Sequence, residues 1–446
     1  MFRTLFQNIQ ELIPTNGAAF QHILVSLKTR NFRLYFGGMC VSLIGTWMQQ
    51  IAMSWLVYEL TGSVLLLATV TFMAQIPILV VTPFVSVFVD RFDRRKILYF
   101  TQTLSMIQAL LMAVLTLTGL ITVWQIMLLS LLIGCINALD NPTRQAFYPS
   151  LVPKDHLSNA IALNSTVING SRLIGPAIGG VLIGMFGEGI CFLINGISYA
   201  GVIIALMRMK LAPFKSRRVQ QHVLTDLSEG FAYVAASIPI RTLLSIMCVV
   251  SFFGLPLMTF IPAYVKDMLH GESEMLGLML SCIGCGSFAA AVMLAARRSV
   301  LGLGKIVTIA SILLGICLVS ISFVTIPWIA AVLCVPIGFA IITTVASINT
   351  LLQTLSDEDK RGRVMGYLAM TFTGVSPIGS ITLGMVVDSI GLPLVILLSG
   401  ICCIGGAVLF ERYRPIVRKH ARPIYVRKGI IKEIAIGIDN SENQQF

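Results

Sequence analysis

This sequence contains little charge. Only 12% of its 446 residues are Asp, Glu, Lys or Arg, whereas 56% are hydrophobic and the mean hydropathy is +0.87. A soluble globular domain has about 25% charged residues, so the composition excludes that class. The sequence therefore predicts a polytopic membrane protein, built from apolar helices that face lipid.

Signatures of nucleotide, metal and redox chemistry are also missing. No Gly-rich loop ends in Gly-Lys-Ser or Gly-Lys-Thr, so ATP is not expected to drive the protein directly. Cys282 and Cys285 form a Cys-x-x-Cys pair, but no second pair accompanies it, and all five histidines lie in loops or tails. We therefore expect no metal, no cofactor and no enzymatic activity.

Carboxylates and histidines are absent from the middle of every predicted membrane segment. All twenty Asp and Glu residues lie in loops, in tails or at helix ends, and Glu59, Asp140 and Asp388 come nearest to a span. A conventional mid-membrane acid for proton coupling is therefore missing. If protons are the coupling ion, a helix-end acid such as Asp140 or Asp388 is expected to carry them.

Apolar runs long enough to cross a bilayer are abundant. A membrane core about 30 Å thick needs about 20 such residues per helix. We expect an all-α membrane protein with twelve transmembrane helices, at 34–58, 65–89, 97–118, 124–140, 159–185, 189–207, 242–264, 275–296, 305–325, 328–351, 364–387 and 392–410. The first 30 residues hold no uninterrupted apolar core, so no cleavable signal is expected.

The basic residues are distributed unevenly between alternate loops. Counted from a cytoplasmic N-terminus, the inner loops and tails carry 30 of the 32 Lys and Arg residues, with Lys266 and Arg172 as the exceptions. The positive-inside rule then predicts that both termini are cytoplasmic. Because the basic residues form no domain of their own, nucleic-acid binding is not expected.

The twelve predicted spans divide into two six-helix halves. Residues 31–207 form the N-terminal half and 242–410 the C-terminal half, and the cytoplasmic central loop 208–241 separates them. Weak similarity between 173–180 and 374–380 supports internal duplication, which would place a substrate path between the halves. Residues 1–30 are expected to form a cytoplasmic amphipathic N-terminus. The basic tail 411–446 is expected to lie in the cytoplasm, where its Lys and Arg can contact anionic lipid.

Three charged loops carry the most specific patterns. Residues 90–96 read DRFDRRK, residues 140–147 after the fourth run read DNPTRQAF, and residues 356–364 before the eleventh run read SDEDKRGRV. They resemble the corresponding loops of the major facilitator superfamily, in the drug:proton antiporter branch that includes macrolide efflux pumps and the enterobactin exporter. Ser86 and Asp93 stand where the usual pattern of the first loop has glycine.

This resemblance implies roles for charged residues at the cytoplasmic helix ends. In the family, the first aspartate of the loop caps a helix of the opposite half, where an anion is favoured, and the loop arginines pair with a carboxylate that ends the fourth helix. By resemblance, Asp90 faces the eleventh helix near Arg363, and Arg94 reaches Asp140. The alternative is that the charges of this short loop serve only to fix the orientation of the helices in the membrane. The gating and charge-relay set is Asp90, Arg91, Arg94, Arg95, Asp140, Arg144 and Arg363.

The fifth run contains Gly175-Pro176-x-x-Gly179-Gly180, which resembles a fifth-helix motif of antiporters in the same superfamily. Proline kinks a helix by removing a backbone donor, and glycines let a neighbouring helix approach closely. The motif predicts a kinked, tightly packed helix that keeps the cavity from leaking. Small-residue packing without a functional consequence is the alternative.

Arg172 is the only basic residue deep within a predicted span, and it shares one helix face with Ser165 and Asn169. We hypothesise that this stripe lines a central cavity, where Arg172 contacts an anionic or polar group of the substrate. Arg172 could instead hydrogen-bond carbonyls of an adjacent helix, and the uncharged side chains could merely hold helices together. The predicted substrate-cavity set is Thr46, Gln49, Gln50, Ser165, Asn169, Arg172, Thr373 and Ser376.

The residues and the resemblance together predict a monomeric secondary exporter of the bacterial cytoplasmic (inner) membrane. It would move a small amphipathic solute, such as a siderophore or a drug, out of the cytoplasm by alternating access, with protons as the coupling ion. A lysophospholipid translocator is one alternative. A non-transporting sensor or scaffold is another, and it would require a sizeable soluble domain.

Overall fold

The structure is a computed structural model that describes residues 25–89, 92–210, 223–297 and 299–431. Every regular element in these ranges is helical, and twelve helices are long and apolar enough to cross a membrane. The prediction of an all-α membrane protein with twelve spans is therefore confirmed.

The first six spans precede the central connection, and capping residues mark the ends of at least two of them. The Asp93 side chain accepts a hydrogen bond from the backbone N–H of Arg95 (2.9 Å) and caps one helix. Gly62 adopts a left-handed conformation (φ 59°) that terminates another. These spans are α3 (Arg30–Thr61), α4 (Val64–Val89), α5 (Arg94–Leu117), α6 (Val123–Phe147), α7 (Leu157–Phe186) and α8 (Glu188–Arg208).

The seventh span is irregular. It runs over Ile238–Met268 as α10 (Ile238–Val249), a π-helical turn (Val250–Gly254), α11 (Pro256–Ala263) and a second π-helical turn (Tyr264–Met268). Pro256 and Pro262 lack the backbone N–H that a regular helix needs, and the π turns lie beside them. The remaining spans are α12 (Ser273–Ala295), α13 (Leu303–Ile321), α14 (Pro327–Leu355), α15 (Arg361–Ile390) and α16 (Leu392–Arg427).

Two segments expected to be loop or tail contain helix. Within the predicted central loop 208–241, α9 spans Val223–Ala236, and α16 continues through Arg427 into the predicted tail. Hydropathy alone marks the apolar part of a helix, so it ends α16 too early. Residues 1–24, predicted to be amphipathic, lie outside the described residues, and the domain boundaries stay predictions.

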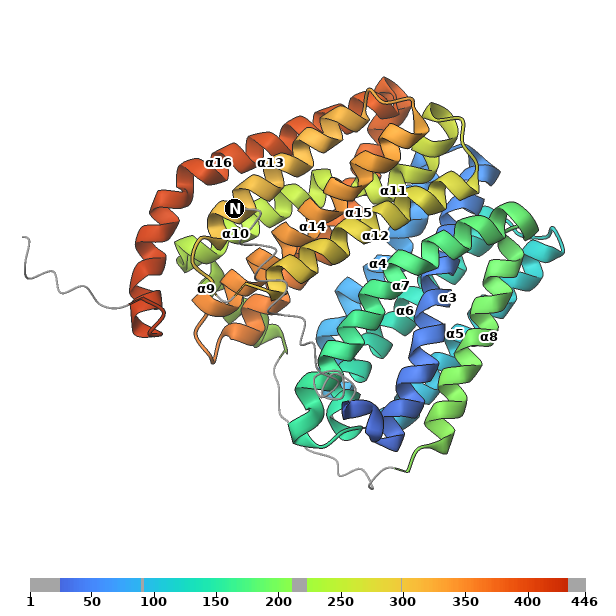
Figure 1. The fold of residues 1–446 in the computed structure, drawn as a ribbon, viewed down its shortest axis with the longest axis horizontal. Coiled ribbons are helices and arrows are strands. Elements are labelled where there is room, and N and C mark those ends of the chain that lie inside the picture. The colour runs from blue at the N-terminus through green and yellow to red at the C-terminus, as the bar shows by residue number, and fades with distance from the viewer. Residues whose placement is uncertain (1–24, 90–91, 211–222, 298, 432–446) are drawn as a thin grey trace, which may run out of the picture.

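The spans pack in two groups that meet along two helix pairs. In the first group α8 lies against α3 and α5, and α4 against α6; in the second, α14 lies against α12 and α13, and α16 against α13. The pairs α7 with α12 and α4 with α15 join the groups. Figure 1 shows the two groups close together at one end and diverging toward the other.

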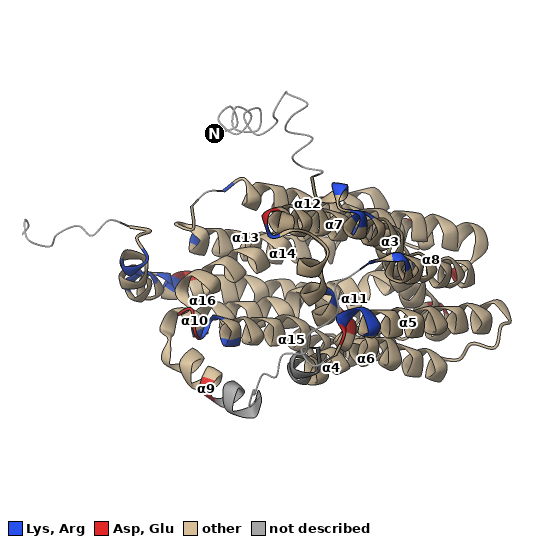
Figure 2. Cartoon of the chain, turned by 90° about the horizontal axis from the view of Figure 1, so that it is seen from below, with Lys and Arg blue, Asp and Glu red and all other residues tan. Residues whose placement is uncertain are grey.

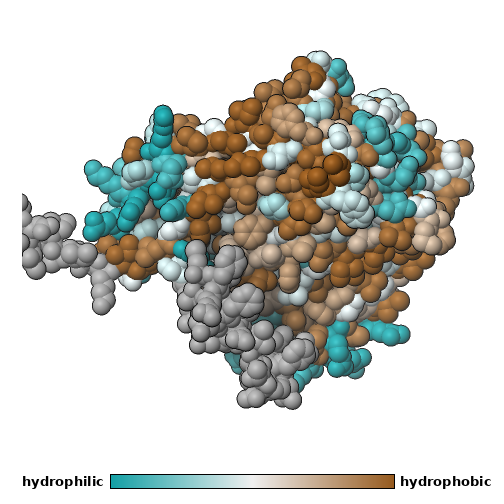
Figure 3. All heavy atoms as spheres, turned by 45° about the horizontal axis from the view of Figure 1, so that its top comes forward, coloured by the Kyte–Doolittle hydropathy of each residue, from teal (hydrophilic) through white to brown (hydrophobic). Residues whose placement is uncertain are grey.

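The two ends of the bundle differ in charge. The helix ends with Arg30, Arg94, Arg208 and Arg361 define what we call the basic end; the other, with Thr61 and Ile390, is the opposite end. Figure 2 shows the Lys and Arg residues concentrated at helix ends and connections. Apolar side chains cover much of the surface between them (Figure 3). At the opposite end Trp124, Phe323 and Trp328 are 70–74% exposed, as expected of aromatic residues at a membrane interface.

Glycines allow α7 and α12 to touch backbone to backbone. A Cβ atom placed on Gly180 would lie 2.8 Å from the Cα of Gly277, and one placed on Gly284 would lie 2.9 Å from the Cα of Leu173. The Ser273 hydroxyl donates to the carbonyl of Gly180 (3.1 Å), and the Ser281 hydroxyl to that of Leu173 (3.0 Å). We call this contact between the two groups the α7–α12 seam.

The seam makes a prediction about side-chain volume. Gly180→Leu should lower the melting temperature of the purified protein, because overpacking a close contact costs about 1–3 kcal/mol. Gly170→Leu on the same helix is the matched control, since a Cβ there meets nothing within 4 Å. Equal melting temperatures for the two variants would contradict a tight seam.

Candidate gating and substrate-binding site

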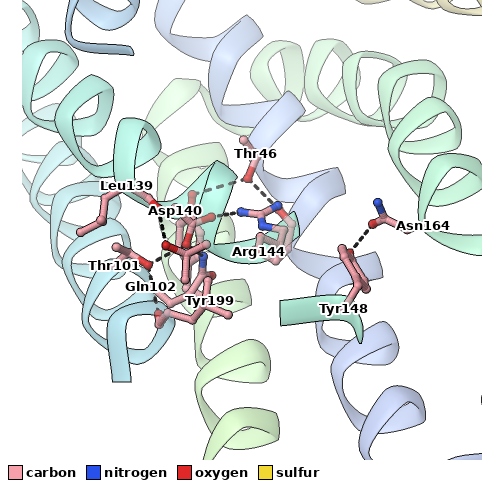
Figure 4. Close-up of polar contacts among 12 residues, drawn as sticks. Thr46, Thr101, Gln102, Leu139, Asp140, Arg144, Tyr148, Asn164 and Tyr199 are labelled. Carbon is pink, nitrogen blue, oxygen red and sulfur yellow. Dashed lines mark hydrogen bonds and ion pairs between the residues drawn. The ribbon is translucent and has the colours of Figure 1, made fainter. Parts of the chain in front are cut away.

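Asp140 is the centre of a buried polar cluster near the basic end. Its side chain is 2% exposed and forms an ion pair with Arg144, one turn further along α6. From α5, the Thr101 hydroxyl and the Gln102 amide donate to the other carboxylate oxygen, at 2.6 and 2.9 Å. Figure 4 shows these groups converging on the carboxylate, with Thr46 of α3 beside them. The cluster links α5 to α6 and supplies partners for the Asp140 carboxylate, which would otherwise be an unpaired charge in an apolar environment.

The expected ion pair between Arg94 and Asp140 does not form in the structure. Among the described residues, the ion-pair partner of Asp140 is Arg144. Arg94 donates instead to the backbone carbonyl of Ala146 (3.0 Å), further along α6. Arg94 thus still binds the end of α6, but through backbone. Arg144 pairs with the Asp140 carboxylate because the two residues are one turn apart on the same helix, so no tertiary contact is needed to bring them together.

The rest of the predicted gating set lies in two places. Arg95 donates to the carbonyl of Met207 at the end of α8 (3.0 Å). Arg363, near the start of α15, forms an ion pair with Glu229 of α9 (2.6 Å). Asp90 and Arg91 lie outside the described residues, so their expected position facing α15 stays a prediction.

Asp357, in the charged loop 356–364 that the sequence singled out, is the centre of a second cluster, whose partners the sequence did not identify. Its carboxylate accepts hydrogen bonds from the Tyr233 hydroxyl (3.0 Å) and from Arg427 (2.5 Å). These bonds lower the pKa of the Asp357 carboxyl, and burial raises the pKa of Tyr233. Lys428 donates to the carbonyls of Thr354 and Ser356, both at 2.8 Å. The cluster joins α9, the α14–α15 connection and the end of α16.

Gln49 lies inside the first helix group. It is 7% exposed, its amide nitrogen donates to Gln108 of α5 (3.1 Å), and its amide oxygen accepts from Asn195 of α8 (2.7 Å). These bonds fit the alternative that polar side chains hold helices together. Thr46 donates to the carbonyl of Ser42 in its own helix (2.9 Å), and Gln50 is exposed.

The stripe on α7 carries a cation with an aromatic partner. The guanidinium of Arg172 lies 4.9 Å from the ring centroid of Trp47 on α3, a cation–π distance. Its buried Nε has no hydrogen-bond partner, and no carboxylate pairs with it among the described residues. Asn169 donates to the carbonyl of Ser165 (2.8 Å), and both residues remain accessible. The stripe thus combines one unpaired cation with uncharged polar groups.

The predicted cavity residues of α15 lie in the second group. Thr373 donates to the carbonyl of Ala369 within its own helix and is partly exposed, as is Ser376. Ser380, one turn beyond Ser376, lies 3.3 Å from the hydroxyl of Thr259. The structure therefore places these residues on the helix that packs against α4, whereas Arg172 is on α7, which packs against α12.

The fifth-helix motif packs α7 between two neighbours. Cβ atoms placed on Gly175 and Gly179 would lie 2.5 Å from Cβ of Trp47 and 2.6 Å from Cγ2 of Ile51, both on α3. Gly180 faces α12, and Pro176 is buried. The motif thus serves close packing on two sides, and the same approach of α3 to α7 brings Trp47 next to Arg172.

At the opposite end, polar contacts link the two groups. The Tyr58 hydroxyl of α3 donates to Asp267, and Lys266 lies 5.5 Å from the ring centroid of Trp55. The carboxylate of Glu274 touches Gly184 at the end of α7. The residues of this second junction are far apart in the sequence and carry no motif, so sequence reasoning missed it. Together with the seam, they join the two groups toward the opposite end.

Comparisons with known proteins agree with one another. A family model described as a transmembrane secretion effector matches residues 23–423. The staphyloferrin A transporter of Staphylococcus aureus is 24% identical over 385 residues, which cover 85% of this chain and 95% of that protein. The multidrug efflux pump Tap of Mycolicibacterium fortuitum is 26% identical, covering 77% and 85%. Macrolide efflux protein A of Streptococcus pyogenes is 22% identical, covering 84% and 96%.

Solved structures share the fold. The nucleoside transporter NupG superposes with a TM-score of 0.68 at 12% identity, over 87% of this chain and 99% of that one. A POT family transporter bound to a thioalcohol-conjugated peptide gives 0.68 at 13% identity, over 87% and 96%. At these identities the similarity concerns the fold alone.

The Asp140 cluster predicts which arginine is coupled to the carboxylate. Asp140→Asn and Arg144→Gln should each lower thermal stability, because breaking a buried pair costs about 3–5 kcal/mol, and the double variant should lose clearly less than the two together. Arg94→Gln combined with Asp140→Asn is the control and should be close to additive. Strong coupling of Asp140 to Arg94, and none to Arg144, would contradict the observed pairing.

Proposed function

Because the chain belongs to the transmembrane secretion effector family of the major facilitator superfamily, we propose that it exports a small amphipathic solute by alternating access. The chain is a multi-pass membrane transporter of an efflux family, and not an enzyme. The substrate, the coupling ion and the orientation in the membrane are our proposals.

The uneven contact between the two helix groups carries the proposal of alternating access. The α7–α12 seam joins the groups from the middle of α7 toward the opposite end, and the Tyr58–Asp267 contact joins them at that end, whereas the groups diverge toward the basic end (Figure 1). The positive-inside rule assigns the basic end to the cytoplasm, with both termini there. The conformation then corresponds to a state in which the basic end is the more open, ready to receive a solute from the cytoplasm of a bacterium through its inner membrane.

The α7 stripe supports an amphipathic substrate with an anionic group. An unpaired cation at membrane depth is unfavourable, and a carboxylate or similar anion would compensate Arg172 when bound. Trp47 offers an apolar surface beside it, and Ser165 and Asn169 offer uncharged hydrogen-bonding groups. A siderophore or an anionic drug has this combination, in keeping with relatives named for staphyloferrin A and multidrug transport.

We propose that a proton gradient drives export. Among the acidic residues whose burial the structure describes, Asp140 alone is buried. A second conformation that separates Asp140 from Arg144 would leave the carboxylate without its counter-ion, so Asp140 is our candidate for the group that carries the proton. The alternative is that Asp140 only latches α5 to α6.

The other functions raised by the sequence have less support. A sensor or scaffold would need a folded soluble domain, and the only helix outside the spans longer than one turn, in the described ranges, is α9 with 14 residues. No contact in the structure favours lysophospholipid over another amphipathic substrate. We propose that the transporter acts as a monomer, since each copy contains both helix groups.

Energy coupling can be tested with the protein in proteoliposomes. Export should collapse when the proton gradient is dissipated and should not require ATP, because the chain contains no nucleotide-binding loop. Asp140→Asn should abolish proton-driven transport if Asp140 carries the proton. A variant that responds normally to the gradient would leave Asp140 as a latch, whereas wild-type transport that ignores the gradient would reject proton coupling.

The substrate class can be tested in cells. Deleting the gene should deplete an anionic amphipathic compound from the medium and raise it in the cytosol, measured by comparative metabolite analysis. When the deletion strain is complemented with the gene for the Arg172→Gln variant, export should recover to about a tenth of the wild-type level or less. The reason is that a hydrogen bond to a charged group contributes about 1.5–3 kcal/mol. Arg297→Gln, an exposed change at the basic end, is the control at equal membrane levels. Normal export by Arg172→Gln would remove Arg172 from the substrate site.

A further inference from the structure

The last helix is longer than a membrane span requires. It has 36 residues, whereas a bilayer core needs about 20. Pro415, inside the helix, lacks a backbone donor and so permits a bend. Figure 1 shows the final part of α16 turning away from the direction of its apolar part, outside the bundle. We call residues 409–427 the α16 extension.

The extension is anchored to the protein at three points along its length. Glu411 accepts a hydrogen bond from Thr308 of α13 (2.7 Å) and pairs with Arg414 (2.5 Å). Ala421 is buried, and Arg427 binds Asp357 at the α14–α15 connection. The extension is therefore held against the basic end near its start, in its middle and at its end.

The outer side of the extension has two adjoining stripes. At about 100° per residue, the exposed basic and apolar positions form two arcs that adjoin on the side opposite Ala421, and Glu411 lies within the basic arc. Within the described ranges, no ion pair or hydrogen bond involves the side chains of the four residues in the basic arc. The basic arc consists of Arg412, Arg418, Lys419 and Arg422, all exposed, and the apolar arc consists of Leu409, Tyr413 and Ile416, 56%, 50% and 43% exposed.

We propose that the outer face of the α16 extension binds anionic phospholipid headgroups at the surface of the membrane. Adjacent basic and apolar stripes on one helix match a bilayer interface, where the apolar stripe enters the acyl boundary and the cations meet phosphates. The extension starts where the apolar part of α16 ends, so its first residues lie near the depth of the headgroups. A soluble acidic partner would satisfy the cations but would leave the apolar stripe in water.

Through Arg427 and Asp357, the bound lipid would steady the connection between α14 and α15. That connection precedes Arg363 and the first turn of α15, which belong to the predicted gating set. The proposal concerns lipid binding by the folded chain, and it does not depend on which solute is transported.

The test compares melting temperatures of the full-length protein in detergent after addition of phosphatidylglycerol or phosphatidylcholine. Phosphatidylglycerol should raise the melting temperature more. Arg412→Gln/Arg418→Gln/Lys419→Gln/Arg422→Gln should lose at least half of this difference. Lys28→Gln/Arg30→Gln/Arg33→Gln/Lys96→Gln, four exposed changes at the basic end of the other group, should keep it.

Three results would overturn the proposal. They are an equal loss in both variants, no preference for phosphatidylglycerol in the wild type, and the same stabilisation by soluble glycerol phosphate, which would indicate a free-anion site. If the fourfold α16 variant does not fold, Arg412→Gln/Lys419→Gln serves instead, and retained phosphatidylglycerol is counted by native mass spectrometry. The double variant should then retain fewer lipids than wild type, and an equal number contradicts the proposal.

Discussion

The close approach of α7 and α12 is the constraint on which the rest of the structure depends. Between lipid-embedded helices there is little hydrophobic driving force, so tight packing must supply the affinity. Gly180, Gly277 and Gly284 supply it by letting backbones touch. Because α7 also packs its Gly175 and Gly179 against α3, the same helix fixes the distance between Arg172 and Trp47. One helix thus both joins the two groups and positions the proposed substrate contact.

Charge is placed according to the cost of leaving it unpaired. Asp140 is buried, and it has a full set of partners in Arg144, Thr101 and Gln102. Arg172 is the contrasting case, because the part of the chain that the structure describes offers it a ring but no anion. In the proposed function, the anionic group of the substrate supplies the missing counter-ion. Asp357 and Glu229 show a third arrangement, because they lie at the basic end and form ion pairs with Arg427 and Arg363 of other helices. These pairs are accessible to solvent, so each contributes little to stability alone.

The sequence was sufficient for features that depend on local pattern and insufficient for those that depend on pairing. Hydropathy identified the twelve spans, because lipid forces each long apolar run into a helix. It could not identify the basic continuation of α16 or the length of α9, because propensity for helix outside the membrane carries no hydropathy signal. The glycines of the fifth-helix motif predicted close packing, but not that Gly277 is the partner. Both Arg94 and Arg144 were expected near Asp140, and the i, i+4 spacing of Arg144 was the signal that could have decided which of them pairs with it. Tyr58 with Asp267, and Gln49 with Asn195, depend on tertiary contacts between distant segments.

We propose that the two helix groups rock relative to each other, so that the ends open in alternation. The most direct measurement is the pair of electron spin–spin distances between labels at the two ends, in lipid nanodiscs and a cysteine-free background. Lys154 and Glu358 are exposed at the basic end, and Leu120 and Phe323 are 66% and 71% exposed at the opposite end. Between acidic and alkaline buffers, the account predicts opposite changes: when the basic-end distance shortens, the opposite-end distance lengthens. Distances that change in the same sense, or an opposite end that stays closed while the basic end closes, would contradict it.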